Sequence, residues 1–504
     1  MQPSESRLIN SISDSLADLA SGLGEKQQAV LFNVQIALTE LLLRTDKAYF
    51  IARFEQGLAL VEEGVALAKA QAALTGNAPS EILLNDHEDK EISAKLDKVG
   101  QALEVVVKLL TKCEAESKDV SAYLARVVDW ENELYQRRQN VGGMQNKTAA
   151  STSVFTAEAI SQYLMIRNAS RDTVKVDNLI MLSGGFSKTT VLFDVKKPNQ
   201  DSESLVIRAE QPLSLLFLPG AKVANEFHVL KLAYEAGIPV AEPLWLEKDK
   251  ALFGEHFIVS RKAAGQNLGS RINVREQLSD SLLHDFVRNL ARIHQTPISP
   301  DDDNVRCSHL ANAAKFVTRT EAIAELLRCW REGIENLGLP PSPLLVRALS
   351  WLENNIPDDT GKPVLLHGDY GLHNILVEND RVSCILDWES SNLGDPAEDI
   401  AWLLDGLGEQ VDRQRIIDIY EKESGTAISE YRLRYFAIWN VLKFAVVCPT
   451  AISLFENNER AGIDACQLGL FFTYHGTARL NHAIEQAEQA EQAEQARIGS
   501  KKAS

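Results

Sequence analysis

The spacing of apolar residues changes near residue 150, and this change constrains the fold most strongly. From residue 8 to residue 138 apolar side chains recur at helical spacing, as in Leu8, Ile12 and Leu16, and no strand-like alternation competes. After residue 153, short runs such as VDNLIML, TTVLFDV, SLVIRAE and HFIVSR are broken by turn residues, as in a sheet. The sequence therefore predicts an all-helical part followed by a mixed helix and sheet part.

The length agrees with two folded units. The chain has 504 residues, and single hydrophobic cores usually stop growing at about 250 to 300 residues. The connections between the expected N-terminal helices are mostly short, which favours an antiparallel bundle. These helices are expected near 6–22, 25–44, 46–74, 89–116 and 119–138.

The net charge and the cysteine pattern limit which partners the protein is expected to bind and in which compartment it is expected to lie. The formal net charge is −18, so long-range repulsion opposes binding to nucleic acid or to anionic lipid. The six cysteines show no metal-ligand spacing, and buried, reduced thiols are expected. No uncharged apolar run reaches the roughly 20 residues of a membrane span, and residues 1–8 lack a signal-peptide pattern. A cytoplasmic protein is expected.

Polar residues directly follow two apolar runs between residues 363 and 389. PVLLHGD has the form of a buried strand that enters a loop, and NILVENDRVSCILDWE has the form of a hairpin that turns at 378–381. This arrangement brings Asp369, Asn374 and Asp387 together. Carboxylate and amide oxygens with phosphate oxygens can hold Mg²⁺, which leaves Asp369 to accept a proton from a hydroxyl.

An alternative for these residues is a solvated loop, because single Asp and Asn residues form turns more often than they bind ligands. Turn formation explains Asn379 and Asp380. It does not explain His-Gly-Asp directly after one apolar strand, or Asp-Trp-Glu directly after another.

The pattern HGDxxxxN, with DWE 13 residues later, resembles the catalytic signature of the aminoglycoside phosphotransferase and choline kinase branch of the protein-kinase-like fold. The resemblance implies an α+β fold: a bilobal protein-kinase-like domain, here preceded by an all-α helical bundle domain. It implies that Asp369 is the base or orients the hydroxyl, that Asn374 and Asp387 hold Mg²⁺, and that His367 supports this catalytic loop.

The resemblance also sets the expected domain boundaries. They are a helical bundle at 1–140, a linker at 141–154, an N-lobe with a five-stranded antiparallel sheet at 155–262, a mostly helical C-lobe at 263–484 and a low-complexity tail at 485–504. The AEQ repeats of the tail offer no wide apolar stripe, so the tail is expected to be exposed.

Nucleotide contacts are expected in the N-lobe. In SGGFSKTT, residues Gly184 and Gly185 can turn the chain sharply and, with Phe186 and Ser187, direct backbone N–H groups at phosphate oxygens. A Gly-Gly hairpin is also ordinary in any sheet. The resemblance implies ATP and Mg²⁺ as cofactors, and the sequence does not choose ATP over GTP.

Arg208 stands where the family usually carries Lys. Its planar fork suits phosphate, although an edge-strand Arg facing water is the alternative. An ion pair with Glu226, 18 residues later, would match the Lys-Glu pair of kinases. The Arg and the run EFHVLKLAYEAGIPVAEPLWL resemble kinase-like modules related to those fused to acyl-CoA dehydrogenases.

Three further expectations concern the hinge and the C-lobe. Main-chain groups near Ser260 to Lys262 would receive an adenine edge. Asp395 is expected to cap a helix, and Asp399 corresponds to the family residue that supports the catalytic loop from behind.

Three functions remain open at this level. The first is an ATP- and Mg-dependent phosphotransferase that acts on a hydroxyl group of a small metabolite, with a hydroxyacyl-CoA favoured by the subgroup resemblance. The second is an aminoglycoside or amino-alcohol kinase, whose cationic acceptor suits the acidic chain. The third is a nucleotide-binding scaffold without turnover. The N-terminal helices could also form a homodimer.

Overall fold

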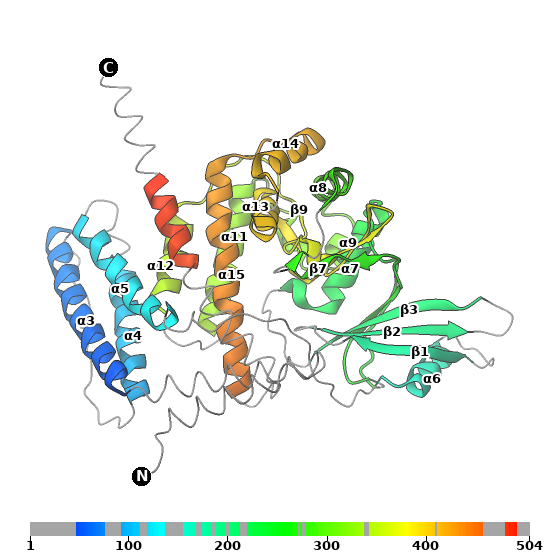
Figure 1. Cartoon of the computed structure of the whole chain (residues 1–504), viewed down its shortest axis with the longest axis horizontal. Coiled ribbons are helices and arrows are strands. Elements are labelled where there is room, and N and C mark those ends of the chain that lie inside the picture. Colours follow the sequence, from blue (N-terminus) through cyan, green and yellow to red (C-terminus); the bar gives the residue numbers. More distant parts are fainter. Residues whose placement is uncertain are drawn as a thin grey trace, which may run out of the picture. The chain divides into compact units, whose positions relative to one another are not determined.

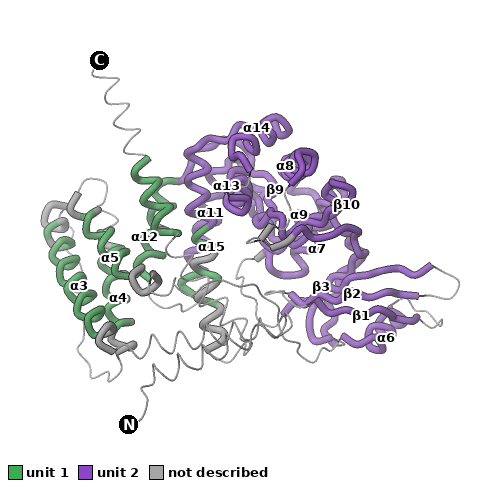
Figure 2. Tube along the Cα trace, in the orientation of Figure 1, with its two compact units in different colours: residues 1–148, 334–355, 441–504 green, residues 149–333, 356–440 purple. Residues whose placement is uncertain are grey.

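The chain folds into two compact units (Figure 2). The first consists of Met1–Thr148, Ile334–Asn355 and Val441–Ser504, and the second of Ala149–Gly333 and Ile356–Asn440. The structure is a computed structural model. It describes residues 47–75, 92–110, 118–136, 155–167, 174–182, 188–196, 201–211, 219–251, 253–270, 273–274, 278–336, 342–408, 411–456 and 479–490.

The first unit is helical where it is described (Figure 1). Its core is built from buried residues such as Leu103, Val106, Tyr123 and Val127. The expectation of an all-helical N-terminal part is thereby confirmed for the described residues, whereas the helices expected at 6–22 and 25–44 lie outside them. The helices wholly within this unit are α3 (Lys47–Thr75), α4 (Ile92–Leu110), α5 (Lys118–Gln136), α12 (Pro343–Asn354) and a last helix at 479–490.

Helix α12 packs with these helices, although its residues were expected to belong to the C-lobe. Glu131 on α5 accepts hydrogen bonds from the Ser342 hydroxyl and, at 2.7 Å, from the Leu344 amide. Glu104 on α4 accepts the Ser342 amide at 2.6 Å. The two carboxylates accept hydrogen bonds from amides that have no partner within the helix. Their negative charge also interacts favourably with the positive end of the helix dipole. The expected domain boundaries otherwise stay predictions.

The tail was expected to be exposed, and this is wrong for Ala487, although Gln486 and Gln489 are exposed. Leu480, Ile484 and Ala487 are buried on one face of the last helix. Glu488 pairs with the buried Arg347 of α12 at 2.9 Å. Positions i, i+4 and i+7 share a helix face, so even a narrow stripe of apolar residues becomes buried when another helix packs on it.

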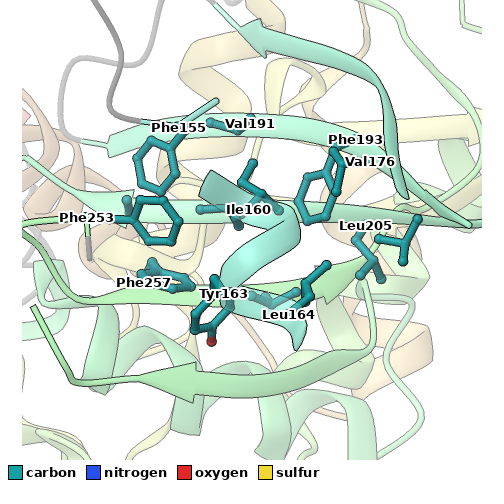
Figure 3. Packing of buried hydrophobic residues seen from close by; sticks show 14 of the residues in the cluster. Phe155, Ile160, Tyr163, Leu164, Val176, Val191, Phe193, Leu205, Phe253 and Phe257 are labelled. Atoms are coloured by element: carbon teal, nitrogen blue, oxygen red, sulfur yellow. The ribbon is translucent and has the colours of Figure 1, made fainter. Parts of the chain in front are cut away.

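The second unit begins with the five-stranded antiparallel sheet that was expected, in the order β1-β2-β3-β5-β4. One face is covered by α6 (Ala157–Arg167), whose Ile160, Tyr163 and Leu164 pack with Phe155 and Phe257 (Figure 3). The strands are β1 (Lys175–Leu182), β2 (Lys188–Lys196), β3 (Glu203–Glu210), β4 (Pro243–Glu247) and β5 (Phe257–Arg261).

The opposite face of this sheet carries the polar site. In β3 the odd-numbered residues from Leu205 to Ala209 are buried, while the even-numbered ones, including Arg208, are less buried and point the other way. Thr190 of β2 lies opposite both Arg208 and Leu182 in the register, so these three share the open face. Ile180 and Leu182 are 55% and 51% exposed there.

The remaining elements of the second unit are mostly helical, as expected for the C-lobe. The hairpin predicted at 378–381 is present: Asn379 and Asp380 both have positive φ, as a two-residue turn requires. The helices are α7 (Val223–Glu235), α8 (Asp280–His294), α9 (Asp303–Arg306), α10 (Leu310–Ala313), α11 (Arg319–Asn336), α13 (Ala397–Leu407), α14 (Arg413–Ser424) and α15 (Glu430–Glu456), of which α11 and α15 extend past the unit boundary. The short strands are β6 (Gln266–Asn267), β7 (Gly269–Ser270), β8 (Asn273–Val274), β9 (Val364–Leu366), β10 (Ile375–Glu378), β11 (Arg381–Ile385) and β12 (Asn392–Gly394).

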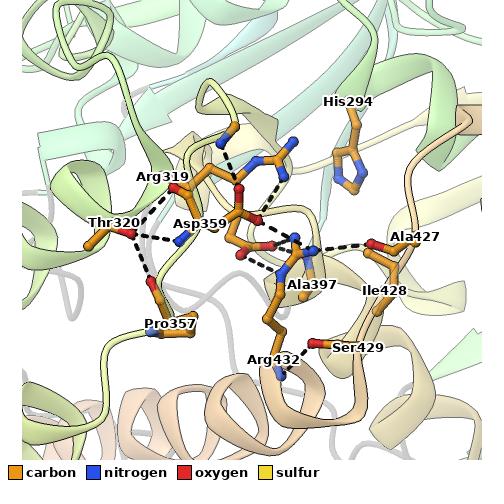
Figure 4. Close-up of polar contacts among 12 residues, drawn as sticks. His294, Arg319, Thr320, Pro357, Asp359, Ala397, Ala427, Ile428, Ser429 and Arg432 are labelled. Carbon is orange, nitrogen blue, oxygen red and sulfur yellow. Dashed lines mark hydrogen bonds and ion pairs between the residues drawn. The ribbon is translucent and has the colours of Figure 1, made fainter.

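An ion-pair network joins the helices of this unit (Figure 4). The Arg432 guanidinium contacts Asp395, which precedes α13, and lies 3.5 Å from Asp359, which also pairs with Arg319 at 3.0 Å. Asp395 accepts the Ala397 amide at 2.8 Å, so it caps α13 as the sequence predicted.

Two further expectations can be compared with the described residues. None of the described helices is both long enough and apolar enough to cross a lipid bilayer. Cys384 is buried as expected, but Cys307 is exposed. It follows α9, a helix too short to bury the residues at its end.

Replacing Ile160 by Ala should lower the free energy of unfolding by about 2 to 5 kcal/mol, because the change leaves a cavity between α6 and the sheet. Ile166, on the same helix but 71% exposed, is a matched control, and Ile166→Ala should change stability by no more than about 0.5 kcal/mol. Urea unfolding followed by circular dichroism measures both values. Equal losses in the two variants would contradict this packing.

Candidate functional site

The HGD segment leaves β9 through a turn that only glycine fits. Gly368 has φ +78°, and a Cβ added there would lie 2.1 Å from the Ser390 carbonyl oxygen. A side chain at this position would therefore meet both backbone strain and a steric clash. The turn places Asp369 immediately after the buried strand, where its side chain is 28% exposed.

Asp399 holds the HGD segment from behind. Its two carboxylate oxygens accept the backbone amides of His367 and Gly368, each at 2.8 Å. His294 on α8 lies 3.1 Å from the same carboxylate and 2.7 Å from the Tyr420 hydroxyl. Burial acts to raise the pKa of Asp399, but its hydrogen bond and attraction to His294 outweigh burial and lower the pKa. The carboxylate is thus an ionised anchor for the loop.

His367 ties this loop to the strand that precedes Asp387. Its Nε2 donates to the Leu386 carbonyl at 2.8 Å, and its Nδ1 accepts the Asp369 amide at 3.3 Å. Burial lowers the pKa of His367, which agrees with a neutral ring that donates at one nitrogen and accepts at the other. Both contacts are with backbone groups, so His367 links the HGD segment to the strand before Asp387.

Asp369, Asn374 and Asp387 come from three segments that lie together. Asn374, in the short 3₁₀ helix η3 (Leu372–Asn374), donates its Nδ2 to Asp369 Oδ2 at 2.8 Å. The Asn374 carbonyl accepts the Leu386 amide at 2.7 Å, which brings Asp387 beside it. Asp387 has a left-handed backbone, φ 64° and ψ 67°, a conformation that Asp tolerates better than most residues.

Arg208 connects the open sheet face to this loop. Its Nε lies 2.9 Å from Glu226 Oε1 on α7, and its Nη2 contacts Asp387. Glu389 lies 3.6 Å from the same nitrogen. Burial alone would lower the pKa of Arg208, but the nearby carboxylates, Asp387 foremost, outweigh it and raise the pKa. The guanidinium is therefore charged and held from both sides.

Lys188 and Glu389 were not predicted from the sequence to be site residues. Lys188 is only 3% exposed, and its Nζ lies 2.8 Å from Glu389 Oε2. Strand alternation could have found Lys188, because even-numbered positions of β2 lie on the same face as Arg208. Glu389 was quoted as part of DWE, but no pattern pairs it with a residue 201 positions earlier.

Among the described residues of the site, carboxylates outnumber cations. The four carboxylates are Glu226, Asp369, Asp387 and Glu389, and the two cations are Lys188 and Arg208. Burial raises the pKa of Asp387 to about 7, against the pull of Arg208 and with the neighbouring carboxylates adding to the rise. A divalent cation would relieve this repulsion.

The oxygen atoms of this site fit Mg²⁺ better than a metal ion that is enclosed entirely by protein ligands. Within the described ranges, no group of three or more His, Cys, Asp or Glu residues is arranged to hold a metal ion. Mg²⁺ is commonly held by one or two carboxylates, with waters and substrate phosphates completing its ligands. Asp387 and the amide of Asn374 suit that pattern.

The remaining predicted residues are less informative. Gly184, Gly185, Phe186 and Ser187 lie outside the described residues. Ser260 sits in β5 opposite Val206, and the Lys262 amide donates to the Ser204 carbonyl at 2.9 Å. That amide extends the sheet, and a nucleotide contact of the other main-chain groups near Ser260 to Lys262 stays a prediction.

His373 was also missed. Its Nε2 lies 3.2 Å from Asp369 Oδ1, on the carboxylate oxygen that Asn374 does not contact. It stands directly before Asn374, at one of the variable positions of the HGDxxxxN pattern. Nothing in a one-dimensional pattern shows that its ring turns back toward Asp369.

Curated relatives match only part of this chain. Acyl-CoA dehydrogenase family member 11 from Gallus gallus is 29% identical over 189 residues, which is 37% of this chain and 23% of that protein. The protein of the same name from Rattus norvegicus is 28% identical over 207 residues, 40% of this chain and 25% of its own length. A probable aminoglycoside 3'-phosphotransferase from Lactococcus lactis is 24% identical over 178 residues, which is 34% of this chain and 62% of that protein. The chain thus spans about a quarter of the length of the two acyl-CoA dehydrogenase relatives.

A solved structure described as a putative aminoglycoside phosphotransferase from Ralstonia eutropha is also similar. It is 19% identical with a TM-score of 0.48, and the match covers 66% of this chain and 99% of that chain. The sequence profile of the phosphotransferase enzyme family matches residues 181–435, a span that includes Arg208, the HGD loop and Asp387. The expectation of an α+β fold is confirmed by the helices and sheets of the described residues. Because the family match covers just over half of the 504 residues, the chain belongs to the phosphotransferase enzyme family.

Proposed function

We propose that this protein transfers the γ-phosphoryl group of ATP, bound with Mg²⁺, to a hydroxyl group of a small metabolite. The observation that carries the proposal is the meeting of Asp369, Asn374 and Asp387 beside the Arg208–Glu226 ion pair. Phosphoryl transfer needs cations over the phosphates, a metal site and a group that orients the nucleophile. The described residues supply a candidate for each.

The open face of the sheet is suited to the nucleotide. Ile180 and Leu182 are apolar yet more than half exposed, and together with Leu192 and Val206, which lie opposite each other in β2 and β3, they offer an apolar surface to a purine ring. Arg208 lies on the same face and would receive the phosphates, and Lys188, which is buried against Glu389, would add positive charge nearby. Arg208 offers a planar fork and Lys188 a point charge.

Asn374 and Asp387 would hold Mg²⁺, and the ion would neutralise charge on the phosphates. The excess of carboxylates supports this assignment, because an acidic site would repel a nucleotide that arrived without its cation. Glu226 and Glu389 would keep Arg208 and Lys188 directed into the site.

Asp369 would accept the proton of the acceptor hydroxyl. As the hydroxyl oxygen bonds to the γ-phosphorus, the bond from that phosphorus to the bridging oxygen breaks, and ADP leaves with the electron pair. The proton passes to an Asp369 oxygen. The partial exposure of Asp369 keeps it accessible to an acceptor.

Asp369→Asn should lower kcat by roughly 10²- to 10⁴-fold, because an amide cannot accept the proton. The dissociation constant of Mg-ATP should stay within about threefold of the wild-type value, since the proposed phosphate and metal ligands remain. Asp418→Asn, at an exposed position of α14, is the matched control and should leave both quantities unchanged. ADP release by a coupled assay and binding by calorimetry measure them.

Nucleotide binding with no turnover in the wild type, and no effect of Asp369→Asn, would instead support a nucleotide-binding scaffold. Self-association through the N-terminal helices also stays a prediction. A sedimentation measurement on the full chain tests it.

The acceptor is proposed to be a hydroxyacyl-CoA. The support is that a stretch covering 37% to 40% of this chain is similar to proteins named as acyl-CoA dehydrogenase family members. An aminoglycoside or amino alcohol is the second candidate, favoured by the net charge of −18, which attracts cations and opposes anionic CoA.

Hydroxyacyl-CoA compounds of several chain lengths should raise ADP release at least about tenfold over the rate with water, which corresponds to about 1.4 kcal/mol of transition-state stabilisation. Aminoglycosides and amino alcohols, tested in parallel, should give no stimulation. The reverse pattern would replace the first acceptor class by the second.

A further inference from the structure

We propose that His373 is a positioning residue that fixes the orientation of the Asp369 carboxylate, and that Gly371 provides the space its ring needs. This inference rests on the proposed function and deepens it. The two Asp369 oxygens have different partners: Oδ2 accepts Asn374 Nδ2 at 2.8 Å, and Oδ1 lies 3.2 Å from His373 Nε2. An ionised carboxylate can only accept, so His373 Nε2 carries the hydrogen and donates it.

The space for this contact comes from Gly371. A Cβ at position 371 would lie 2.6 Å from Cε1 and 2.7 Å from Nδ1 of His373, closer than side-chain atoms can pack. The backbone of Gly371 is extended, with φ −160°, and any residue can adopt that conformation. Glycine is therefore needed here for the imidazole ring, not for the backbone.

The backbone of His373 is held independently of its ring. Its carbonyl accepts Asn267 Nδ2 at 2.8 Å, and the next amide, of Asn374, donates to the Gly371 carbonyl at 3.0 Å. Removing the imidazole thus leaves these backbone contacts in place and takes away the His373 contact on Asp369 Oδ1. The ring is 22% exposed and the Asp369 side chain 28%, so both members of the contact are partly open to solvent.

The contacts with Asn374 and His373 together restrict rotation of the Asp369 carboxylate. With both contacts, the carboxylate plane is fixed and presents a defined lone pair to the hydroxyl. Without the His373 contact, Oδ1 loses one restraint and the group can rotate more easily from a reactive geometry, and misplacement by about 1 Å costs up to about 10²-fold in rate. The nucleotide site, formed by other residues, should not respond.

The test is a double-mutant cycle on the full chain, with Mg-ATP and both water and the best acceptor of the panel. His373→Ala and Gly371→Ala should each lower kcat by roughly 10- to 100-fold and leave the KM for ATP within about twofold. His373→Gln keeps a donor of similar reach and should restore kcat to within about threefold. His284→Ala, a half-exposed histidine on α8, is the control and should have no effect.

The double variant decides whether glycine acts through the histidine. Gly371→Ala should have no further effect on kcat in the His373→Ala background, because the clashing ring is gone. Additive losses, or a wild-type rate in His373→Ala, would overturn the inference. Thermal unfolding of each variant shows whether the fold is kept.

A readout without turnover separates this inference from the proposed function. In ¹⁵N NMR spectra of the histidine rings, the His373 signal, assigned by its loss in His373→Gln, should show the Nε2–H tautomer. Asp369→Ala should shift it. An unshifted signal rejects the contact even if the enzyme is active, whereas the predicted shift in a protein that never consumes ATP rejects only the proposed function.

Discussion

The position of the Arg208 guanidinium is the constraint on which the site depends. It is held by Glu226 on α7 at 2.9 Å and by Asp387 from the segment after β11, 179 residues later in the chain. The Arg208 position therefore depends on how three separate elements pack. Removing one partner from a mostly buried ion pair leaves an uncompensated charge, which is strongly destabilising. The same interaction that orders the elements therefore places a cation beside the candidate metal ligand.

A second cation follows from the same strand geometry. Lys188 begins β2 on the face of the sheet that carries Arg208, and it pairs with Glu389, two residues after Asp387. Two ion pairs thus join the open sheet face to one short loop. Even so, carboxylates outnumber cations among the described residues, and they add to the rise that burial causes in the pKa of Asp387. We propose that a ligand that brings positive charge together with phosphate completes this arrangement.

Much of the mixed unit could be predicted because its signals are local. Strand alternation gave β1, β2, β3 and β5, and the turn at Asn379 and Asp380 fixed the hairpin. The Arg208–Glu226 pair was expected because both residues lie in clear elements and a family resemblance linked them. The positions of the Asp and Asn side chains followed from strand ends.

The missed features depend on contacts between distant segments or on the path of a single side chain. Glu131 can support the start of α12 only because the chain returns to the first unit after residue 333, and no pattern announces that return. Burial of Ala487 depends likewise on a neighbouring helix. The ring of His373 turns back over Gly371, and this is a rotamer choice that sequence spacing does not encode.

The most direct test of the central claim is a calorimetric titration of the wild-type protein with ATP, with Mg²⁺ and then with EDTA. If a surplus of carboxylates shapes this site, Mg²⁺ should tighten ATP binding at least about tenfold, or about 1.4 kcal/mol, because the bare nucleotide meets the repulsion of Asp387 and its neighbours. Equal affinity in the two conditions, or tighter binding in EDTA, would contradict the account.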